Sequence, residues 1–381
     1  MVNSYIEILH HACYNNKKIR KAVYHVQKQK SSVPCRQHGS TYAVAAGMRR
    51  IRIAQIGINR FSHGPDIFET LRALPDVFDI AGYVLVEGER ETCADKLHVF
   101  DGFPALTVEE ILADPTIEAV AVETDEIHLT KYAKMAADAG KHIHMEKPGS
   151  PDGAAFDALI DAVKESGKVF HLGYMYRYNP YIVDAAVRAA SGTLGDVFAV
   201  EAQMSRLDSE TVRRWLGEFP GGMMFYLGCH LVDIVLRAQG MPQNIVPLSR
   251  PTADGFGEDY GMAVLEYPHG VSLIKAAGTE IGGGNRRQLV ITGTGGSIEI
   301  RPLEVRIPGD GYLFQSQKRE TMPGKPVQES TSEPFDRYVP MMCAFAGMVR
   351  GERENPYSPE YERTLFHTLL ACCGAEEYKK L

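Results

Sequence analysis

The sequence has no long apolar run and no excess of positive charge. No window approaches the roughly 18 consecutive apolar residues that a membrane-spanning helix requires. The 48 acidic residues outnumber the 41 lysines and arginines, which gives a formal net charge of -7. A nucleic-acid-binding protein would need a basic stripe to offset phosphate charge. These absences exclude a membrane span, argue against a nucleic-acid partner and predict a soluble, cytoplasmic protein.

Cysteine is sparse and shows no functional pattern. The seven cysteines form no CxxC pair and no zinc-ligand spacing, so we interpret them as reduced thiols. Cys372 and Cys373 lie in an apolar stretch and are interpreted as small buried side chains. His142, His144 and Glu146 could share one side of a strand as in a metal site, but no further ligand spacing supports them. We therefore predict no metal.

The length of the chain predicts two domains, which follow an N-terminal segment of different composition. At 381 residues the chain exceeds the size at which one core usually stops growing. Residues 1–48 are basic, Glu7 is their only acidic residue, and they lack the apolar region of a secretory signal. Three interpretations stay open: Met48 is the natural start, the segment is transit-like, or residues 5–29 form a helix that docks on the body.

Residues 49–172 alternate strand and helix. Apolar runs predict the strands, and a 3.6-residue period predicts the helices. The expected strands are residues 51–56, 80–86, 119–122, 141–145 and 169–172, and the expected helices include residues 108–113, 129–139 and 153–165. This repeated unit predicts an α/β domain with a doubly wound parallel sheet.

Residues 173–381 have a different pattern, in which longer alternating strands are joined by turn signals such as His269-Gly270. The expected strands are residues 197–204, 262–267, 271–277, 287–292 and 297–300, and the expected helices are residues 181–190, 221–237, 341–349 and 360–373. We predict an α+β domain with a large, open, mostly antiparallel sheet.

The turn after the first strand reads G-I-N-R-F-S over residues 57–62, a degenerate form of the G-x-G-x-x-G dinucleotide signature. Gly57 would make the tight turn, Asn59 can adopt the left-handed conformation, and Ser62 is small enough for close helix packing. The helix N-terminus beyond the turn would then hold a pyrophosphate.

An acid after the second strand, Glu87, occupies the place that contacts the adenosine ribose in such folds. A carboxylate there favours the free 2′-hydroxyl of NAD and repels a 2′-phosphate. Arg60 and Arg90 lie close by in sequence, and an arginine could instead accommodate NADP.

Two further motifs indicate proton transfer. The tripeptide E-K-P at residues 146–148 sets an ammonium group at the carboxyl edge of the sheet, where open α/β proteins bind ligands. The pair G-G at residues 221–222 opens a predicted helix in which Tyr226, His230 and Asp233 follow an i, i+4, i+7 spacing along one face.

Together these motifs resemble the Gfo/Idh/MocA oxidoreductases, the family of glucose-fructose oxidoreductase and inositol dehydrogenase. The resemblance covers about residue 49 to the end, and it includes the stretch G-Y-M-Y-R-Y-N-P at residues 173–180. It implies a Rossmann domain that carries the nicotinamide and an α+β domain that helps form the substrate pocket. Because the second domain often forms an oligomer interface in the family, we expect a homodimer or homotetramer.

The resemblance also implies the cofactor-binding residues. The expected set is Gly57, Asn59, Arg60, Ser62, Glu87, Thr124, Glu146 and Lys147. Lys147 matches the family lysine that touches the nicotinamide ribose and the reacting substrate oxygen, where a cation stabilises a developing alkoxide. Thr124 matches a threonine that lines the nicotinamide site, although Asp125 replaces the usual proline after it.

Two residues compete for the role of acid or base. His230 matches the family histidine that commonly exchanges the proton. Tyr226 stands where many polyol dehydrogenases have an aspartate, and a tyrosine near a cation can itself exchange a proton. A buried structural role for His230 stays open.

Three polar residues are expected to bind substrate. We expect Arg177 and Asn179 to bind substrate hydroxyls or close the interdomain cleft, and Asp233 to hydrogen-bond substrate. A purely structural role is the alternative for each of them.

The expected function is hydride transfer between NAD, or NADP, and a hydroxyl-bearing carbon of a sugar, polyol or related polar substrate. Two alternatives stay open: redox-neutral, NAD-dependent glycoside cleavage or epimerisation, and a non-catalytic dinucleotide-binding regulator.

Overall fold

The computed structural model describes residues 49–309 and 312–379. They form two compact units: the first comprises residues 49–174 and 338–363, and the second comprises the described residues of 175–337 and 364–379. The interpretations of residues 1–48 lie outside the described residues. Within the described ranges, no helix is long and apolar enough to cross a membrane.

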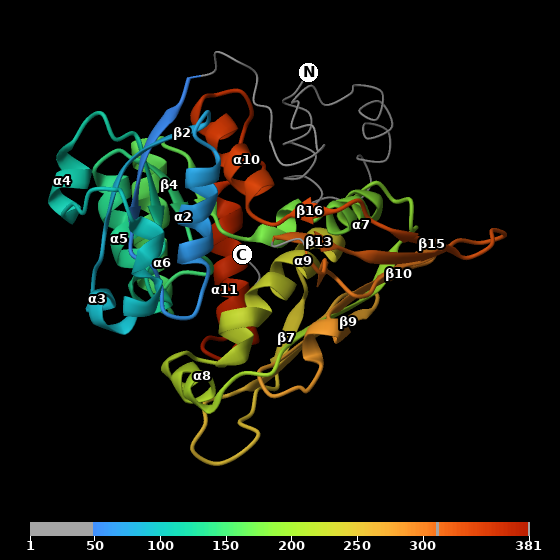
Figure 1. Cartoon of the computed structure of the whole chain (residues 1–381). Coiled ribbons are helices and arrows are strands. Elements are labelled where there is room, and N and C mark those ends of the chain that lie inside the picture. Colours follow the sequence, from blue (N-terminus) through green and yellow to red (C-terminus); the bar gives the residue numbers. More distant parts are fainter. Residues whose placement is uncertain (1–48, 310–311, 380–381) are drawn as a thin grey trace. The chain divides into compact units, whose positions relative to one another are not determined.

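The first unit is built on a five-stranded parallel sheet in the order β2-β1-β3-β4-β5. Its strands are β1 (Ile51–Ile56), β2 (Phe78–Val84), β3 (Ala119–Val122), β4 (His142–Met145) and β5 (Phe170–Leu172). Its helices are α2 (Gly64–Ala73), α3 (Glu89–Thr92), η3 (Ala94–Phe100), α4 (Val108–Ala113), α5 (Glu126–Asp138), α6 (Gly153–Ser166) and α10 (Val339–Val349). Figure 1 labels two of the strands, β2 and β4, in blue and green. The prediction of a doubly wound parallel sheet is confirmed.

Local sequence explains why these elements form. All four residues of β3 are buried, as expected for a strand covered on both faces. Thr107 and Glu110 start α4 with a reciprocal capping box. Strand order reverses between β1 and β3, so the ligand-binding crevice of this fold lies at their carboxyl ends.

The second unit contains an eight-stranded sheet in the order β15-β14-β11-β10-β6-β9-β8-β7 and a small sheet in the order β12-β13-β16. The large sheet comprises β6 (Val197–Ser205), β7 (Asn244–Pro247), β8 (Tyr260–Glu266), β9 (Val271–Ala277), β10 (Gln288–Gly293), β11 (Gly296–Ile300), β14 (Gln317–Thr321) and β15 (Gln328–Thr331). The small sheet comprises β12 (Val305–Arg306), β13 (Leu313–Gln315) and β16 (Phe335–Asp336). The predicted antiparallel sheet is confirmed, although β6 and β9 pair in parallel.

In the part of the second unit that the structure describes, the strands are connected by seven helical segments. They are η4 (Met175–Tyr178), α7 (Pro180–Ala190), α8 (Glu210–Trp215), η5 (Leu216–Glu218), η6 (Met224–Gly228), α9 (Cys229–Gln239) and η7 (Gly283–Arg286). The division between the units falls within the last helix, α11 (Pro359–Cys372).

The helix expected over residues 221–237 is not one regular α-helix, and that prediction is wrong. Gly221 (φ 67°) and Gly222 (φ 46°) adopt left-handed conformations and form a turn before it. The helical segment then begins with the π-helix η6 and continues as α9. A π-helix has more residues per turn than the 3.6 of an α-helix, so Tyr226 on η6 does not keep the α-helical spacing to His230 and Asp233, which both lie on α9.

Candidate active site residues

Buried charged groups gather at the carboxyl ends of β3 and β4. Glu123 and Thr124 follow β3, Glu146 and Lys147 follow β4, and all four residues are at most 2% exposed. Lys147 Nζ lies 3.4 Å from Glu146 Oε1, which also accepts a hydrogen bond from Ser62 Oγ at 2.8 Å. This sheet edge is where the fold binds ligands.

Two glutamates that were not predicted, Glu123 and Glu126, make this edge acidic. Burial raises the pKa of Glu126 to about 7, although the Lys147 ammonium opposes the rise. Burial, and then the charge of Glu146, raises the pKa of Glu123 well above its usual value, again against Lys147. The sequence E-T-D-E at the end of β3 was the available signal. Burial thus favours the protonated form of both carboxyl groups, and Glu126 retains a proton up to about pH 7.

Histidine side chains extend the polar network behind this edge. His144 Nε2 lies 3.5 Å from Glu123 Oε1, and His144 Nδ1 lies 2.8 Å from His171 Nδ1. Burial lowers the pKa of His144 to about 3, so its imidazole is neutral at neutral pH. His142 Nδ1 accepts a hydrogen bond from Val169 N at 3.0 Å. Among the residues that the structure describes, no His, Cys, Asp and Glu group is arranged to hold a metal ion.

The glycine turn has the backbone conformation that its sequence predicts. Gly57 has φ 85° and Asn59 has φ 61°, so the asparagine does adopt the left-handed conformation. A Cβ at Gly57 would lie 2.6 Å from the Thr124 methyl group, which leaves room only for glycine. The close packing expected of Ser62 is made instead by Gly64, because α2 begins there and a Cβ would lie 2.1 Å from a backbone oxygen.

The backbone N–H groups of this turn donate to acceptors of the protein itself. Glu89 Oε1 accepts from Ile58 N (3.1 Å) and Asn59 N (3.3 Å). Asp125 Oδ1 accepts from Arg60 N (2.9 Å), and the Asn59 side-chain oxygen accepts from the next two amides at 2.8 and 2.9 Å. A pyrophosphate held by these amides therefore does not fit the turn as it is folded.

Glu87, predicted to contact the ribose, lies beyond β2 with φ 50°. Its Oε1 accepts hydrogen bonds from Lys131 Nζ (2.6 Å) and Tyr132 OH (2.8 Å) of α5. Those two bonds lower the pKa of Glu87, so it is ionised at neutral pH. Its contact with a ribose stays a prediction.

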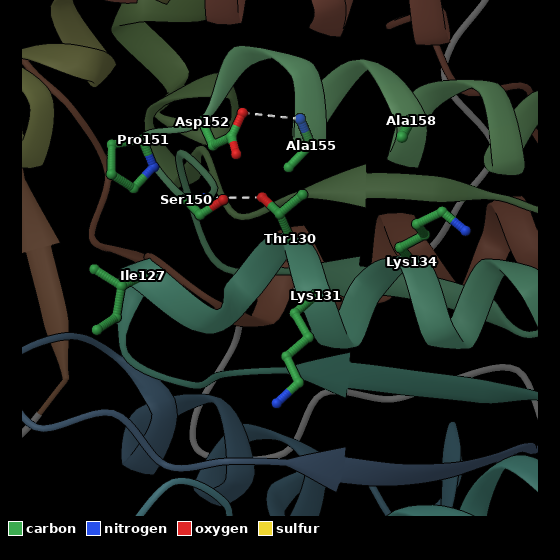
Figure 2. A pocket seen from close by; sticks show the side chains of 9 residues that line it. All are labelled: Ile127, Thr130, Lys131, Lys134, Ser150, Pro151, Asp152, Ala155 and Ala158. Atoms are coloured by element: carbon green, nitrogen blue, oxygen red, sulfur yellow. Dashed lines mark hydrogen bonds between the residues drawn. The ribbon is translucent and has the colours of Figure 1, made fainter.

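A separate pocket lies along α5 and α6 in the first unit (Figure 2). It is lined by Ile127, Thr130, Lys131, Lys134, Ser150, Pro151, Asp152, Ala155 and Ala158. Ser150 N donates to Thr130 Oγ1 at 2.9 Å, and Asp152 caps α6 by accepting from Ala155 N at 3.1 Å. None of the predicted site residues lines this pocket.

In the second unit, Tyr226 lies on η6 and is 3% exposed. Its ring packs edge-on against Trp215, and the Arg206 guanidinium carbon lies 5.0 Å from its ring centroid. Burial lowers the pKa of Arg206, but the Tyr226 phenol and the Asp208 carboxylate outweigh it and raise that pKa. Arg206 Nε contacts Asp208 Oδ1 at 2.7 Å. A cation therefore lies beside the phenol, and the sequence did not identify Arg206 as its source.

His230 has different surroundings. It is buried and packs edge-on against Tyr176, with the ring centroids 5.1 Å apart. The Tyr176 hydroxyl donates to Glu304 Oε1 at 2.6 Å, and burial raises the pKa of Tyr176 to about 12. The Tyr176 phenol beside His230 is therefore neutral at neutral pH, whereas the ring of Tyr226 lies beside a guanidinium.

The three predicted substrate-binding residues make internal contacts. Arg177 Nε and Nη2 donate to Asp233 Oδ1 at 3.1 and 2.9 Å, and both side chains are buried. Asn179 caps α7 by accepting from its first two free amides at 3.0 and 3.2 Å. Its Nδ2 donates to Leu303 O (3.1 Å) and Ser316 Oγ (3.0 Å), so the whole hydrogen-bonding capacity of the amide is used.

Comparison with known families confirms the resemblance read from the motifs. The sequence model of one protein family, described as "Oxidoreductase family, NAD-binding Rossmann fold", matches residues 51–174. The model described as the GFO/IDH/MocA C-terminal domain matches residues 183–299.

Individual relatives are distant. The oxidoreductase YdgJ of Escherichia coli is 26% identical over 287 residues, which are 69% of this chain and 81% of that protein. The scyllo-inositol 2-dehydrogenase (NADP(+)) IolW of Bacillus subtilis is 28% identical over 183 residues, 45% of this chain and half of that protein. The structure of levoglucosan dehydrogenase in complex with NADH and levoglucosan shares the fold, with a TM-score of 0.68 and 19% identity over 86% of this chain and 97% of that one. The chain thus belongs to the Gfo/Idh/MocA family of oxidoreductases, and its first unit is that family's NAD-binding Rossmann domain.

Proposed function

We propose that the protein is an NAD(P)-dependent dehydrogenase that acts on a hydroxyl-bearing carbon of a sugar, polyol or related polar substrate. The observation that carries this proposal is the Lys147 ammonium, buried among carboxyl groups at the ligand-binding edge of the Rossmann sheet. The relatives named as scyllo-inositol and levoglucosan dehydrogenases support the substrate class. A bound nicotinamide would accept the hydride.

Each candidate residue has a separate role in this proposal. Lys147 stabilises the alkoxide that forms as the substrate hydroxyl loses its proton. Tyr226 takes that proton, because the Arg206 guanidinium favours the ionised phenol. His230, which packs edge-on against Tyr176, is the competing base.

We also propose that the protein is a cytoplasmic homodimer or homotetramer. Apolar side chains exposed on the large sheet support self-association, because such surface is usually covered by a partner. They include Phe198 of β6, Val246 of β7 and Val271 of β9, which are 41%, 37% and 51% exposed. Light scattering of the purified protein would give the subunit number.

The activity test follows reduced-nicotinamide absorbance with NAD or NADP and a panel of sugars and polyols. We expect turnover by the wild type, a loss of about 10³-fold in Lys147→Met, which keeps the chain length without the charge, and a smaller loss in Lys147→Arg. Tyr226→Phe and His230→Gln are compared in the same assay, and the true base is the one whose loss removes the alkaline-rising limb of kcat.

The same assay separates the alternatives. Turnover of substrate without net reduced cofactor would indicate redox-neutral cleavage or epimerisation. Dinucleotide binding without any turnover across the panel would indicate a regulator. Either result contradicts the proposed dehydrogenase.

A further inference from the structure

We propose that the glycine turn of the Rossmann domain is filled by the chain's own side chains, and that a dinucleotide binds only by displacing Asn59 and Glu89. This inference rests on the dinucleotide-binding part of the proposed function and is independent of the sugar or polyol substrate. It concerns residues 57–64 and the acceptors that surround them, all of which lie in the first unit.

Asn59 takes the place of a bound anion. Its Oδ1 accepts hydrogen bonds from Phe61 N (2.8 Å) and Ser62 N (2.9 Å), the amides that precede α2. Consecutive backbone amides of this kind form the usual anion cradle before a helix. The side chain is held in place from its other end, where Nδ2 donates to Thr124 O at 2.8 Å. A glycine at this position would leave both amides available.

Glu89 fills the other half of the turn. Its two carboxylate oxygens accept from three backbone amides: Ile58 N (3.1 Å), Asn59 N (3.3 Å) and Val86 N (3.0 Å). The residue is only 4% exposed. A carboxylate that accepts from several amides is held strongly. A phosphate group at this position would be repelled by the Glu89 carboxylate and would find the backbone amides already bonded to it.

The cations near the turn are also engaged. Arg60 Nη2 lies 3.3 Å from Asp125 Oδ2, and the Arg60 amide donates to the same carboxylate at 2.9 Å. Lys96 Nζ donates to the backbone oxygens of Asn59, at 3.3 Å, and of Arg60. The positive charges that could neutralise a pyrophosphate are thus directed to groups within the protein.

The turn therefore behaves as a site whose donors are already satisfied. Dinucleotide affinity is reduced by the free energy needed to release Asn59 and Glu89, so removing either acceptor should tighten binding. The gain in affinity should depend on the phosphate groups of the dinucleotide, because the released donors are backbone amides suited to phosphate oxygens.

The test is calorimetric titration of the full chain and its variants with NADH. Asn59→Gly frees two amides at a residue whose φ suits glycine, and Glu89→Gln removes the charge with little change of shape. Glu91→Gln is the matched control, because Glu91 is an exposed residue of the same helix α3. We expect NADH to bind at least tenfold more tightly to each turn variant than to the wild type or the control.

Nicotinamide riboside is titrated in parallel because it lacks any phosphate, and we expect no comparable gain. Unchanged or weaker NADH binding in the turn variants overturns the inference, and so does an equal gain for both ligands or no NADH binding by any variant. Melting temperatures show which variants are folded, and a misfolded Asn59→Gly leaves Glu89→Gln to decide. Tighter NADH binding without turnover on any substrate would contradict the dehydrogenase while leaving the filled turn supported.

Discussion

The sheet edge of the first unit and the contact between Arg177 of η4 and Asp233 of α9 in the second unit differ in how buried charges are balanced. At the sheet edge, the Lys147 ammonium lies near Glu123, Glu126 and Glu146, and burial raises the pKa values of Glu123 and Glu126. In the second unit, Arg177 donates two hydrogen bonds to the Asp233 carboxylate, and the Arg237 guanidinium lies 3.8 Å from the same carboxylate. Surplus carboxyl groups can exchange protons during a reaction, whereas a carboxylate held by guanidinium groups mainly holds structure.

The largest expected effect comes from breaking the Arg177–Asp233 pair. Arg177→Met leaves the Asp233 carboxylate buried without its two-bond partner, and we expect the free energy of unfolding to fall by about 3–5 kcal/mol. Urea denaturation measures the change. The double variant Arg177→Met/Asp233→Asn should recover part of the loss, because it removes the carboxylate that Arg177→Met leaves without its two-bond partner.

A different outcome would change the role of the pair. If Arg177→Met costs less than about 1 kcal/mol of stability but raises KM for the substrate strongly, Arg177 is a substrate ligand rather than a structural partner.

The unbalanced edge should show itself in the pH dependence of stability. The pKa of Glu126 rises from 4.5 to about 7 on folding, so between these values the folded chain keeps a proton that the unfolded chain releases. This contribution to stability is complete below pH 4.5 and is lost as pH rises through about 7. Relative to Glu126→Gln, the wild type should lose up to about 3 kcal/mol over this window.

Denaturation midpoints of both proteins at several pH values between 5 and 8 measure this difference. The variant Glu109→Gln removes an exposed glutamate of α4 and should follow the wild type at every pH. If the difference in denaturation midpoint between the wild type and Glu126→Gln is the same at every pH, Glu126 is ionised throughout this range and its pKa is not raised by folding.

A smaller effect is expected from Asn179. Asn179→Ala removes the cap of α7 and two donated hydrogen bonds, and we expect a loss of about 1–2 kcal/mol in the free energy of unfolding. Asn179→Ser keeps a capping oxygen and should recover part of it. Substrate KM should not change in either folded variant, and a large rise in KM with normal stability would assign Asn179 to the substrate.

Many of the strands and helices could be predicted from the local pattern of apolar and turn residues in the sequence. The limits of β1 and β3 are those predicted, because a largely buried strand is a short, mainly apolar run bounded by turn residues. The short strands of the small sheet were missed, since two or three residues are too few to show a period. The η6 segment was read as an α-helix because both helical forms have similar composition.

The candidate site, like the fold, was predicted only in part from the sequence. The left-handed Asn59 and the position of Lys147 after β4 follow from residue type and strand order, so the sequence by itself determined the family, the two sheets and the lysine at the sheet edge. Only the tertiary structure decided which groups meet: Arg206 beside Tyr226, Asp233 against Arg177, and Glu89 on the amides of the glycine turn. Each of these contacts joins residues remote in sequence, and the pKa of a buried group depends on neighbours that local periodicity does not encode.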